Sequence, residues 1–280
     1  MHRASFCRVF TAIVAVALMC GLRPALAGPI TVPNGSFEGP DASASPLPDV
    51  DAWTKAGPER VQPHLGQEGL LDTGVFINQP QGTGLHITGV DGAQLAFMGA
   101  QGPANIPDGQ PPIALYQQLP DARFEVGRAY HLVIAVGPAS SAAGRDPRTD
   151  NPSDPDPDAP PAVLGFRFYY LPEGQDPLGP RLDVATGQVR SDQLQQNRVI
   201  DFELVTNPVH ATDPWRHRPI GLEIAPQLGL SGFWNLDNVR VYHTPEPTAA
   251  LLLAAGAAGL LTRRRRTGAS GHLATAINTP

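Results

Sequence analysis

Alternation of apolar and polar side chains with a period of two is the feature that most constrains the fold of this chain. One segment places Arg167 and Tyr169 between apolar residues at every second position, which are Leu164, Phe166, Phe168 and Tyr170. A second segment sets Asp201 and Glu203 against Ile200, Phe202 and Leu204. Such alternation puts one face of a strand in a core and the other in water. No long stretch between residues 28 and 244 has the helical period of 3.6, so we expect strands there.

Glycine and proline punctuate the chain and delimit further strands. The sequence contains 29 Gly and 31 Pro residues, and short apolar stretches lie between them. This pattern is typical of strands joined by turns. We expect a first strand near Ile30 and further strands at Leu85–Val90, Ala93–Met98, Ile113–Leu119, Ala129–Val136, Val163–Leu171, Arg198–Thr206, Pro219–Ile224 and Phe233–Tyr242. Eight or nine strands of this kind predict an all-β domain, an antiparallel β-sandwich of two sheets.

One acidic, proline-rich stretch interrupts the strand pattern. Residues 146–161 read DPRTDNPSDPDPDAPP, which cannot pack in a core, so we interpret them as a long, disordered surface loop. Asp154, Asp156 and Asp158 are spaced like the first ligands of a calcium-binding loop. Ala159 stands where such a loop needs glycine, so the solvated interpretation is preferred.

The start of the chain has the composition of an export signal. Arg3 and Arg8 precede an apolar run over residues 9–20, and the small residues of Ala25-Leu26-Ala27 follow. This order predicts a secretory signal peptide over 1–27 that signal peptidase removes after Ala27. Both cysteines, Cys7 and Cys20, lie inside it. The exported domain over 28–244 therefore has no disulfide bond.

The two ends of the chain hold much of its positive charge. Of the 20 Lys and Arg residues, seven lie at the ends, namely Arg3, Arg8, Arg23 and Arg263 to Arg266. Only Glu246 of the 26 acidic residues lies there, so the domain between the ends is strongly acidic. Nucleic-acid binding needs Lys and Arg opposite phosphates, so we exclude it. An acidic surface is compatible with divalent cations or neutral sugars.

A tripeptide, an apolar run and a basic cluster follow one another near the end of the chain. Pro245-Glu246-Pro247 leads into residues 248–262, which are almost entirely Ala, Leu and Gly, and Arg263, Arg264, Arg265 and Arg266 come next. A helix over 248–262 is roughly 22 Å long, which is short for a bilayer core of about 30 Å. Local thinning of the bilayer and snorkelling of the arginine side chains would let this helix span the membrane. The arginines place everything before Pro245 outside the membrane. The alternative is a buried Ala/Leu helix with a solvated basic end.

This composite segment, over 245–266, resembles the PEP-CTERM sorting segment of Gram-negative bacteria. The resemblance implies cleavage near Pro245 to Pro247 by an exosortase, a separate membrane protease, after transient anchoring in the inner membrane. It implies delivery to the cell surface or the extracellular matrix. In that family the arginines usually end the chain, whereas here residues 267–280 continue as a small, polar tail that we interpret as disordered.

A series of short motifs in the domain over 28–244 resembles another family. In chain order the motifs are Asn34-Gly35-Ser36-Phe37-Glu38 with Trp53, Gly92-Ala93-Gln94-Leu95-Ala96-Phe97, Tyr116-Gln117-Gln118-Leu119, Gly127-Arg128-Ala129-Tyr130-His131-Leu132 and Leu236-Asp237-Asn238-Val239-Arg240-Val241. Together they are similar to galactose-binding-like jelly rolls of the carbohydrate-binding-module type. The resemblance implies a jelly roll and a polysaccharide ligand.

The same resemblance implies a structural calcium ion that ties the first strand to the last. The matching ligand positions are Glu38 and Asp237. Independently, Asp237 shares its strand face with Val239 and Val241, so its carboxylate points to the buried side. A hard cation removes the cost of burying that charge. A hydrogen-bonded turn or an Arg partner is the alternative, and even a bound ion would have no catalytic role.

Aromatic side chains are the candidate contacts for a sugar ring. Trp215 lies in the polar stretch Asp213-Pro214-Trp215-Arg216-His217-Arg218 and is the first candidate. Tyr169, on the outward face of its strand, is the second. We expect Trp53 in the core. The alternative for each candidate is an exposed aromatic without a ligand, which is common on protein surfaces.

Enzyme motifs are absent from the sequence. It contains no G-x-S-x-G, H-E-x-x-H, P-loop or G-x-G-x-x-G pattern. His131 and His243 lie on or beside strands, where a lone histidine is usually structural. The leading hypothesis is therefore a non-enzymatic, exported β-sandwich that contacts polysaccharide. The alternatives are a glycan-active hydrolase or a cyclase on the same jelly roll, and a purely structural or adhesive matrix protein.

Overall fold

A computed structural model of the chain describes residues 27–43, 47, 49–56, 73–100, 113–138, 161–175, 179–227 and 232–245. Residues Ala27–Thr244 form one compact unit. The predictions of a signal peptide, of the loop over 146–161, of the membrane helix over 248–262 and of the tail over 267–280 fall outside these ranges, apart from Ala27 and Pro161. Within the ranges, no helix has the length and apolar character needed to cross a bilayer.

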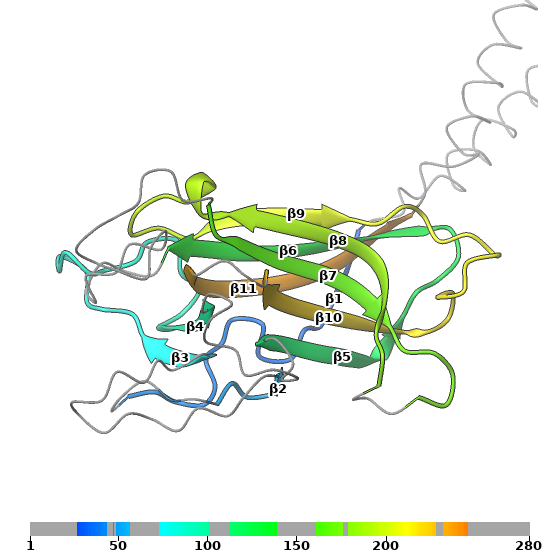
Figure 1. Cartoon of the computed structure of the whole chain (residues 1–280), viewed down its shortest axis with the longest axis horizontal. Coiled ribbons are helices and arrows are strands. Elements are labelled where there is room, and N and C mark those ends of the chain that lie inside the picture. The colour runs from blue at the N-terminus through cyan, green and yellow to red at the C-terminus, as the bar shows by residue number, and fades with distance from the viewer. Residues whose placement is uncertain are drawn as a thin grey trace, which may run out of the picture. The chain divides into compact units, whose positions relative to one another are not determined.

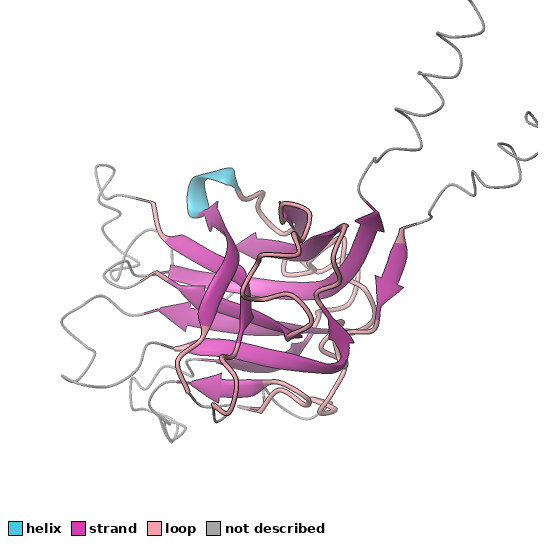
Figure 2. Cartoon of the chain, turned by 90° about the vertical axis from the view of Figure 1, so that its right-hand side faces the viewer, coloured by secondary structure: helices cyan, strands magenta, loops and turns pink. Residues whose placement is uncertain are grey.

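Two antiparallel sheets pack face to face (Figures 1 and 2), which confirms the predicted all-β sandwich. Sheet A has the order β3-β4-β11-β6-β9, and β1 pairs with β11. Its strands are β1 (Gly28–Ile30), β3 (Thr73–Ile77), β4 (Gln94–Ala100), β6 (Arg128–Pro138), β9 (Ile200–Val205) and β11 (Gly232–Pro245). Sheet B has the order β2-β5-β10-β7-β8. Its strands are β2 (Thr54–Ala56), β5 (Ala114–Arg123), β7 (Val163–Tyr170), β8 (Leu182–Arg190) and β10 (Pro219–Pro226).

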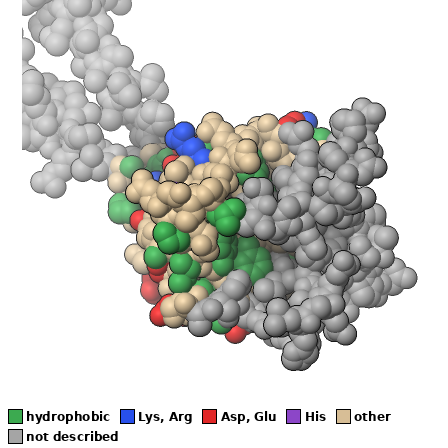
Figure 3. Space-filling view, turned by 90° about the vertical axis from the view of Figure 1, so that its left-hand side faces the viewer, with side chains coloured by type: hydrophobic (Ala, Val, Ile, Leu, Met, Phe, Trp, Pro, Cys, Tyr) green, Lys and Arg blue, Asp and Glu red, His purple; other side chains and the backbone are tan. Residues whose placement is uncertain are grey.

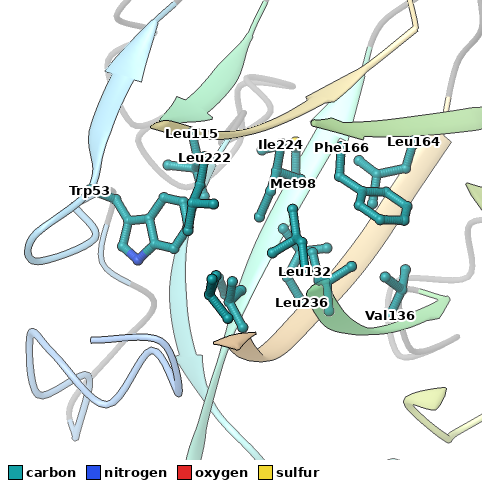
Figure 4. Packing of buried hydrophobic residues seen from close by; sticks show 14 of the residues in the cluster. Trp53, Met98, Leu115, Leu132, Val136, Leu164, Phe166, Leu222, Ile224 and Leu236 are labelled. Carbon is teal, nitrogen blue, oxygen red and sulfur yellow. The ribbon is translucent and has the colours of Figure 1, made fainter. Parts of the chain in front are cut away.

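The core lies between the sheets and is built from the alternating positions. Figure 4 shows Leu132 and Leu236 of sheet A among Leu222, Ile224 and Phe166 of sheet B. Each of these side chains is almost fully buried. Burial of one such side chain stabilises the fold by about 1.5–3 kcal/mol. At the end of the sandwich drawn on the left in Figure 1, hydrophobic side chains also come to the surface (Figure 3).

Most expected strands are present, and their faces are as predicted. Seven of the expected segments overlap β4, β5, β6, β7, β9, β10 and β11, and the early strand overlaps β1. In β7 the residues Leu164, Phe166 and Phe168 are buried in the core, and in β9 the positions alternate between half-buried and exposed.

The prediction of a strand over Leu85–Val90 is wrong. There the chain makes turns, and only Thr88 forms an isolated bridge, with Arg198. Asn78 holds this segment as a loop, because its side chain bonds both the N–H and the carbonyl of Ile87 at 3.0 and 2.8 Å. A turn at Gly89, whose φ is +83°, completes the departure from a strand.

Candidate functional site

The outer face of sheet B carries a cluster of charged and aromatic side chains, which we call the outer cluster. Strand register brings it together, because Glu223 of β10 lies opposite both Arg167 of β7 and Tyr116 of β5. Tyr169 follows on the same face of β7, opposite Gly221. Arg181 reaches the face from the residue before β8.

Glu223 is the centre of the outer cluster and is paired with two arginines. Its Oε1 lies 2.6 Å from Nη2 of Arg167, and its Oε2 lies 3.1 Å from Nη1 of Arg181. Only 9% of the Glu223 side chain is exposed. Arg167 also contacts Asp183 at 2.5 Å. Burial lowers the pKa of Arg167. The hydrogen bonds and the charges of Glu223 and Asp183 together outweigh burial, so the pKa of Arg167 is raised above its ordinary value.

Two tyrosines of the outer cluster lie beneath the Arg181 guanidinium. The Cζ atom of Arg181 is 3.7 Å from the ring centre of Tyr116 and 5.7 Å from that of Tyr169, which is cation–π geometry. The ring of Tyr169 lies across Gly221, where a Cβ would come within 2.4 Å of it. Tyr169 points away from the core, as predicted. It is only 1% exposed, so the prediction of a solvent-exposed ring is wrong. Burial raises the pKa of Tyr169 to about 12.

Trp215 lies apart from this cluster, in the loop between β9 and β10. Its ring is half-buried and packs edge-on against Phe124, with ring centres 5.0 Å apart. The N–H of His217 anchors the same loop by donating to the Phe124 carbonyl at 2.7 Å. Trp53 is buried in the core, as predicted, and contacts Phe37.

Glu38 and Asp237 are tied to the same short loop before β4. The N–H groups of Ala93 and Gln94 both donate to Oε1 of Glu38 at 2.9 Å. The N–H of Asp91 donates to Oδ2 of Asp237 at 2.5 Å, and Oδ1 accepts from Asn238 at 2.7 Å. Gly92, at φ +95°, permits this approach, since a Cβ there would lie 2.3 Å from the Glu38 carboxylate.

Asp237 is fully buried, as predicted from its strand face, whereas Glu38 is exposed. Burial raises the pKa of Asp237 to about 7, and the charges of Asp91 and Glu38 add to the effect, although the two N–H groups oppose it. Among the described residues, no group of three or more His, Cys, Asp and Glu side chains could hold a metal ion. The carboxylates of Glu38 and Asp237 repel each other, so a cation between them would be favourable, and carboxylate oxygens are ligands that calcium prefers. Backbone carbonyls or water would supply the other ligands.

The sorting tripeptide begins inside the last strand. β11 ends at Pro245, whereas Glu246, Pro247 and Arg263 to Arg266 lie outside the described residues. The antiparallel pairing of β1 with β11 places Gly28 opposite His243. The start of the domain and the start of the sorting segment therefore lie side by side in sheet A.

Comparisons with known proteins support the motif and the fold. The family model of the PEP-CTERM protein-sorting motif matches residues 243–266, so the chain carries this motif. A cyclase from Fischerella sp. TAU has 18% identity and a TM-score of 0.55, and the match covers 80% of this chain and all of that one. The Stig cyclase Fisc from the same organism, in complex with (3Z)-3-(1-methyl-2-pyrrolidinylidene)-3H-indole, has 17% identity and a TM-score of 0.53, over 79% of this chain and 100% of that one. Likeness at this identity shows a shared fold alone. No curated protein matches the sequence.

The sequence interpretation missed Arg181, Glu223 and Tyr116 as parts of one cluster. The alternation in the expected strand Pro219–Ile224 already separates Gly221 and Glu223 from the apolar residues, so their outward position was readable. No such pattern marks Arg181, because it precedes β8, and the sequence of β8 does not have the alternation that predicts a strand.

Proposed function

We propose that this protein is an exported β-sandwich that an exosortase delivers to the cell surface or the extracellular matrix, where it binds polysaccharide without catalysis. The sorting motif at 243–266 supports the delivery. The outer cluster on sheet B supports the binding. The single observation that carries this part is the Arg181 guanidinium stacked on Tyr116 beside the buried Glu223.

The outer cluster is costly for a purely structural feature. A buried ion pair often contributes no more stability than apolar residues of similar volume. The Nε atoms of Arg167 and Arg181 are also buried without a hydrogen-bond partner in the described part of the chain. Guanidinium and carboxylate groups are the donors and acceptors that fit neighbouring sugar hydroxyls. A tyrosine offers a sugar ring an apolar face, and Arg181 would have to leave Tyr116 for that ring to stack.

A polysaccharide panel tests this proposal. We expect the purified wild-type protein to bind at least one bacterial polysaccharide, and Glu223→Gln to weaken that binding at least tenfold. Arg190→Ala is the matched control, because Arg190, the last residue of β8, pairs with the exposed Asp192 of the short 3₁₀ helix Ser191–Gln193, and its removal leaves the ion pairs of the outer cluster intact. Binding that survives Glu223→Gln would remove the outer cluster as the site. Turnover of a polysaccharide would favour the hydrolase alternative, and neither binding nor turnover would favour a structural matrix protein.

We also propose that Glu38 and Asp237 hold a structural calcium ion, with the remaining ligands from backbone carbonyls and water. The ion would supply positive charge where the turn at 34–38, the loop at 91–94 and β11 meet. A backbone hydrogen bond beside the two carboxylates supports this placement, because the Val239 N–H donates to the Gly35 carbonyl at 2.7 Å and so joins β11 to the turn at 34–38. We expect calcium to raise the melting temperature relative to chelator, and Asp237→Ala to abolish the rise. Equal melting temperatures in calcium and chelator would exclude this ion.

A further inference from the structure

The sorting motif has no linker between it and the folded domain. Its matched segment starts at His243, and β11 continues to Pro245, so the first residues of the motif are the last residues of a strand. β11 lies inside sheet A, between β4 and β6. The residues at this end of β11 are therefore part of the folded sheet.

Side chains hold this end of β11 on both sides. On the outer face of sheet A, Nε2 of His131 lies 3.0 Å from the Thr244 hydroxyl, and its Nδ1 lies 2.8 Å from Oε1 of Glu203. The His131 ring also stacks on Tyr242, with ring centres 4.4 Å apart and planes 11° apart, and the Tyr242 hydroxyl donates to Glu203. We call these four residues the junction cluster.

His243, between them, faces the other way and is held as well. Nη1 of Arg128 lies 2.9 Å from its Nδ1, and Glu125 lies 2.6 Å from Nε of Arg128. Gly28 of β1 approaches so closely that a Cβ there would lie 2.5 Å from Nε2 of His243. All three residues before Pro245 therefore have fixed positions.

Exposed apolar side chains adjoin the junction cluster. Among the described residues, the exposed large hydrophobic side chains are Val126, Leu182 and Val205, at 46%, 43% and 47%. Val205 of β9 lies directly opposite His131 of β6, on the outer face of sheet A. Val126 lies in the turn just before β6, next to Glu125 and Arg128. Two of the three are thus close to the end of β11.

The short length of the sorting tripeptide limits how far from the folded domain the sorting protease can bind. The tripeptide Pro245 to Pro247 spans at most about 10 Å when fully extended. A protease that grips this tripeptide must therefore come within that distance of Thr244. Specific protein interfaces bury about 800 Å² on each side, far more than a tripeptide offers. Beside Thr244, the exposed Val205 adjoins the polar side chains of His131 and Glu203, and protein interfaces combine apolar with polar residues.

We propose that the sorting protease docks on the folded domain, on the junction cluster together with Val126 and Val205, and so receives the motif in a fixed direction. This proposal rests on the sorting function proposed above and adds the surface that the enzyme contacts. His131 and Thr244 are positioning residues, because they hold the strand end and leave the chemistry to the protease.

Cleavage of the full chain by its own exosortase, in membrane vesicles from cells that make both, tests the proposal. We expect Val205→Glu and Val126→Glu to slow the appearance of the shortened chain, followed by mass spectrometry, at least tenfold. Leu182→Glu is the matched control, because Leu182 has a similar exposed fraction but lies on β8 of sheet B. We expect its rate within twofold of wild type. Equal rates for all three variants would overturn the proposal.

A second variant separates docking from simple crowding. Eight Gly and Ser residues inserted between Thr244 and Pro245 would free the motif from the sheet. Docking predicts slower cleavage of this insertion and of His131→Ala, with unchanged melting of the domain. Faster cleavage would mean that the clamped strand merely obstructs the enzyme, which contradicts docking. A wild-type chain that is never cut would overturn the sorting function itself and the docking proposal with it.

Discussion

The buried carboxylate of Asp237 predicts an unusual dependence of stability on pH. Its pKa is raised from 3.8 to about 7, with burial as the largest cause. A raised pKa means that the folded protein binds the proton more tightly than the unfolded chain does. This contribution to stability is therefore fully present below pH 4, is lost as the pH rises toward 7, and stays lost above it.

The size of the effect follows from the two pKa values. Each pH unit between them corresponds to about 1.4 kcal/mol, so the wild-type protein loses about 4 kcal/mol of unfolding free energy between pH 4 and pH 8. Asp237→Asn removes the titration altogether. In the wild type the carboxylate accepts hydrogen bonds from the N–H groups of Asp91 and Asn238. The substitution places an amide NH₂, which cannot accept, opposite one of these two N–H groups. That mismatch costs about 1–3 kcal/mol at every pH.

Urea unfolding in chelator at several pH values measures both proteins. We expect the wild type to be more stable than Asp237→Asn at pH 4 and less stable at pH 8, because the lost 4 kcal/mol exceeds the cost of the mismatch. The difference between the two proteins cancels other titrating groups, such as Glu203, whose pKa is lowered by its hydrogen bonds to Tyr242 and His131. A constant difference across this range would refute the reasoning. Calcium should flatten the wild-type curve if the proposed ion is bound.

Three further predictions use single substitutions and unfolding free energies. Gly92→Ala should destabilise the fold by at least 1 kcal/mol more than Gly82→Ala, since both have φ near +95° but only Gly92 faces a carboxylate; equal losses would contradict the packing argument. Trp53→Phe should cost more than Trp234→Phe, because the Trp53 indole donates to a carbonyl at 3.3 Å whereas that of Trp234 has no partner in the described part of the chain; the reverse order would be evidence against it. Glu223→Ala should cost about 3–5 kcal/mol, because it leaves two arginines without their buried partner, and a loss below 1 kcal/mol would mean that solvent reaches them.

The fold was predictable where packing alone decides the sequence. β7 and β9 have one face in the core, so their apolar residues must alternate. β8 was missed because it is an edge strand of sheet B, and only Val189 is a buried hydrophobic residue in it. β3 was missed because Thr73–Ile77 is short and contains a glycine. An edge strand such as β8, whose residues are mostly exposed or half-buried, leaves little trace in composition.

The candidate sites were predictable to different depths for a similar reason. The burial of Asp237 follows from its own strand alternation. The cover over Tyr169 does not, because it depends on Arg181, which arrives from outside the strand, and on the register that sets Gly221 opposite the ring. Cross-strand partners such as Thr244 and His131 are separated by 113 residues, and no local pattern relates them.

The position of β1 beside the end of β11 bears on how the proposed processing and the proposed binding would share one domain. Gly28 pairs with His243, so the predicted signal-peptidase bond after Ala27 and the sorting motif both adjoin the same end of sheet A. The outer cluster lies on sheet B, whereas the junction cluster lies on sheet A. Because the core separates the two outer faces, the proposed ligand on sheet B would not compete with the proposed protease on sheet A. Substitutions on one face should therefore leave the other function unchanged, so that Glu223→Gln should weaken polysaccharide binding at least tenfold in a chain that is still sorted at the wild-type rate.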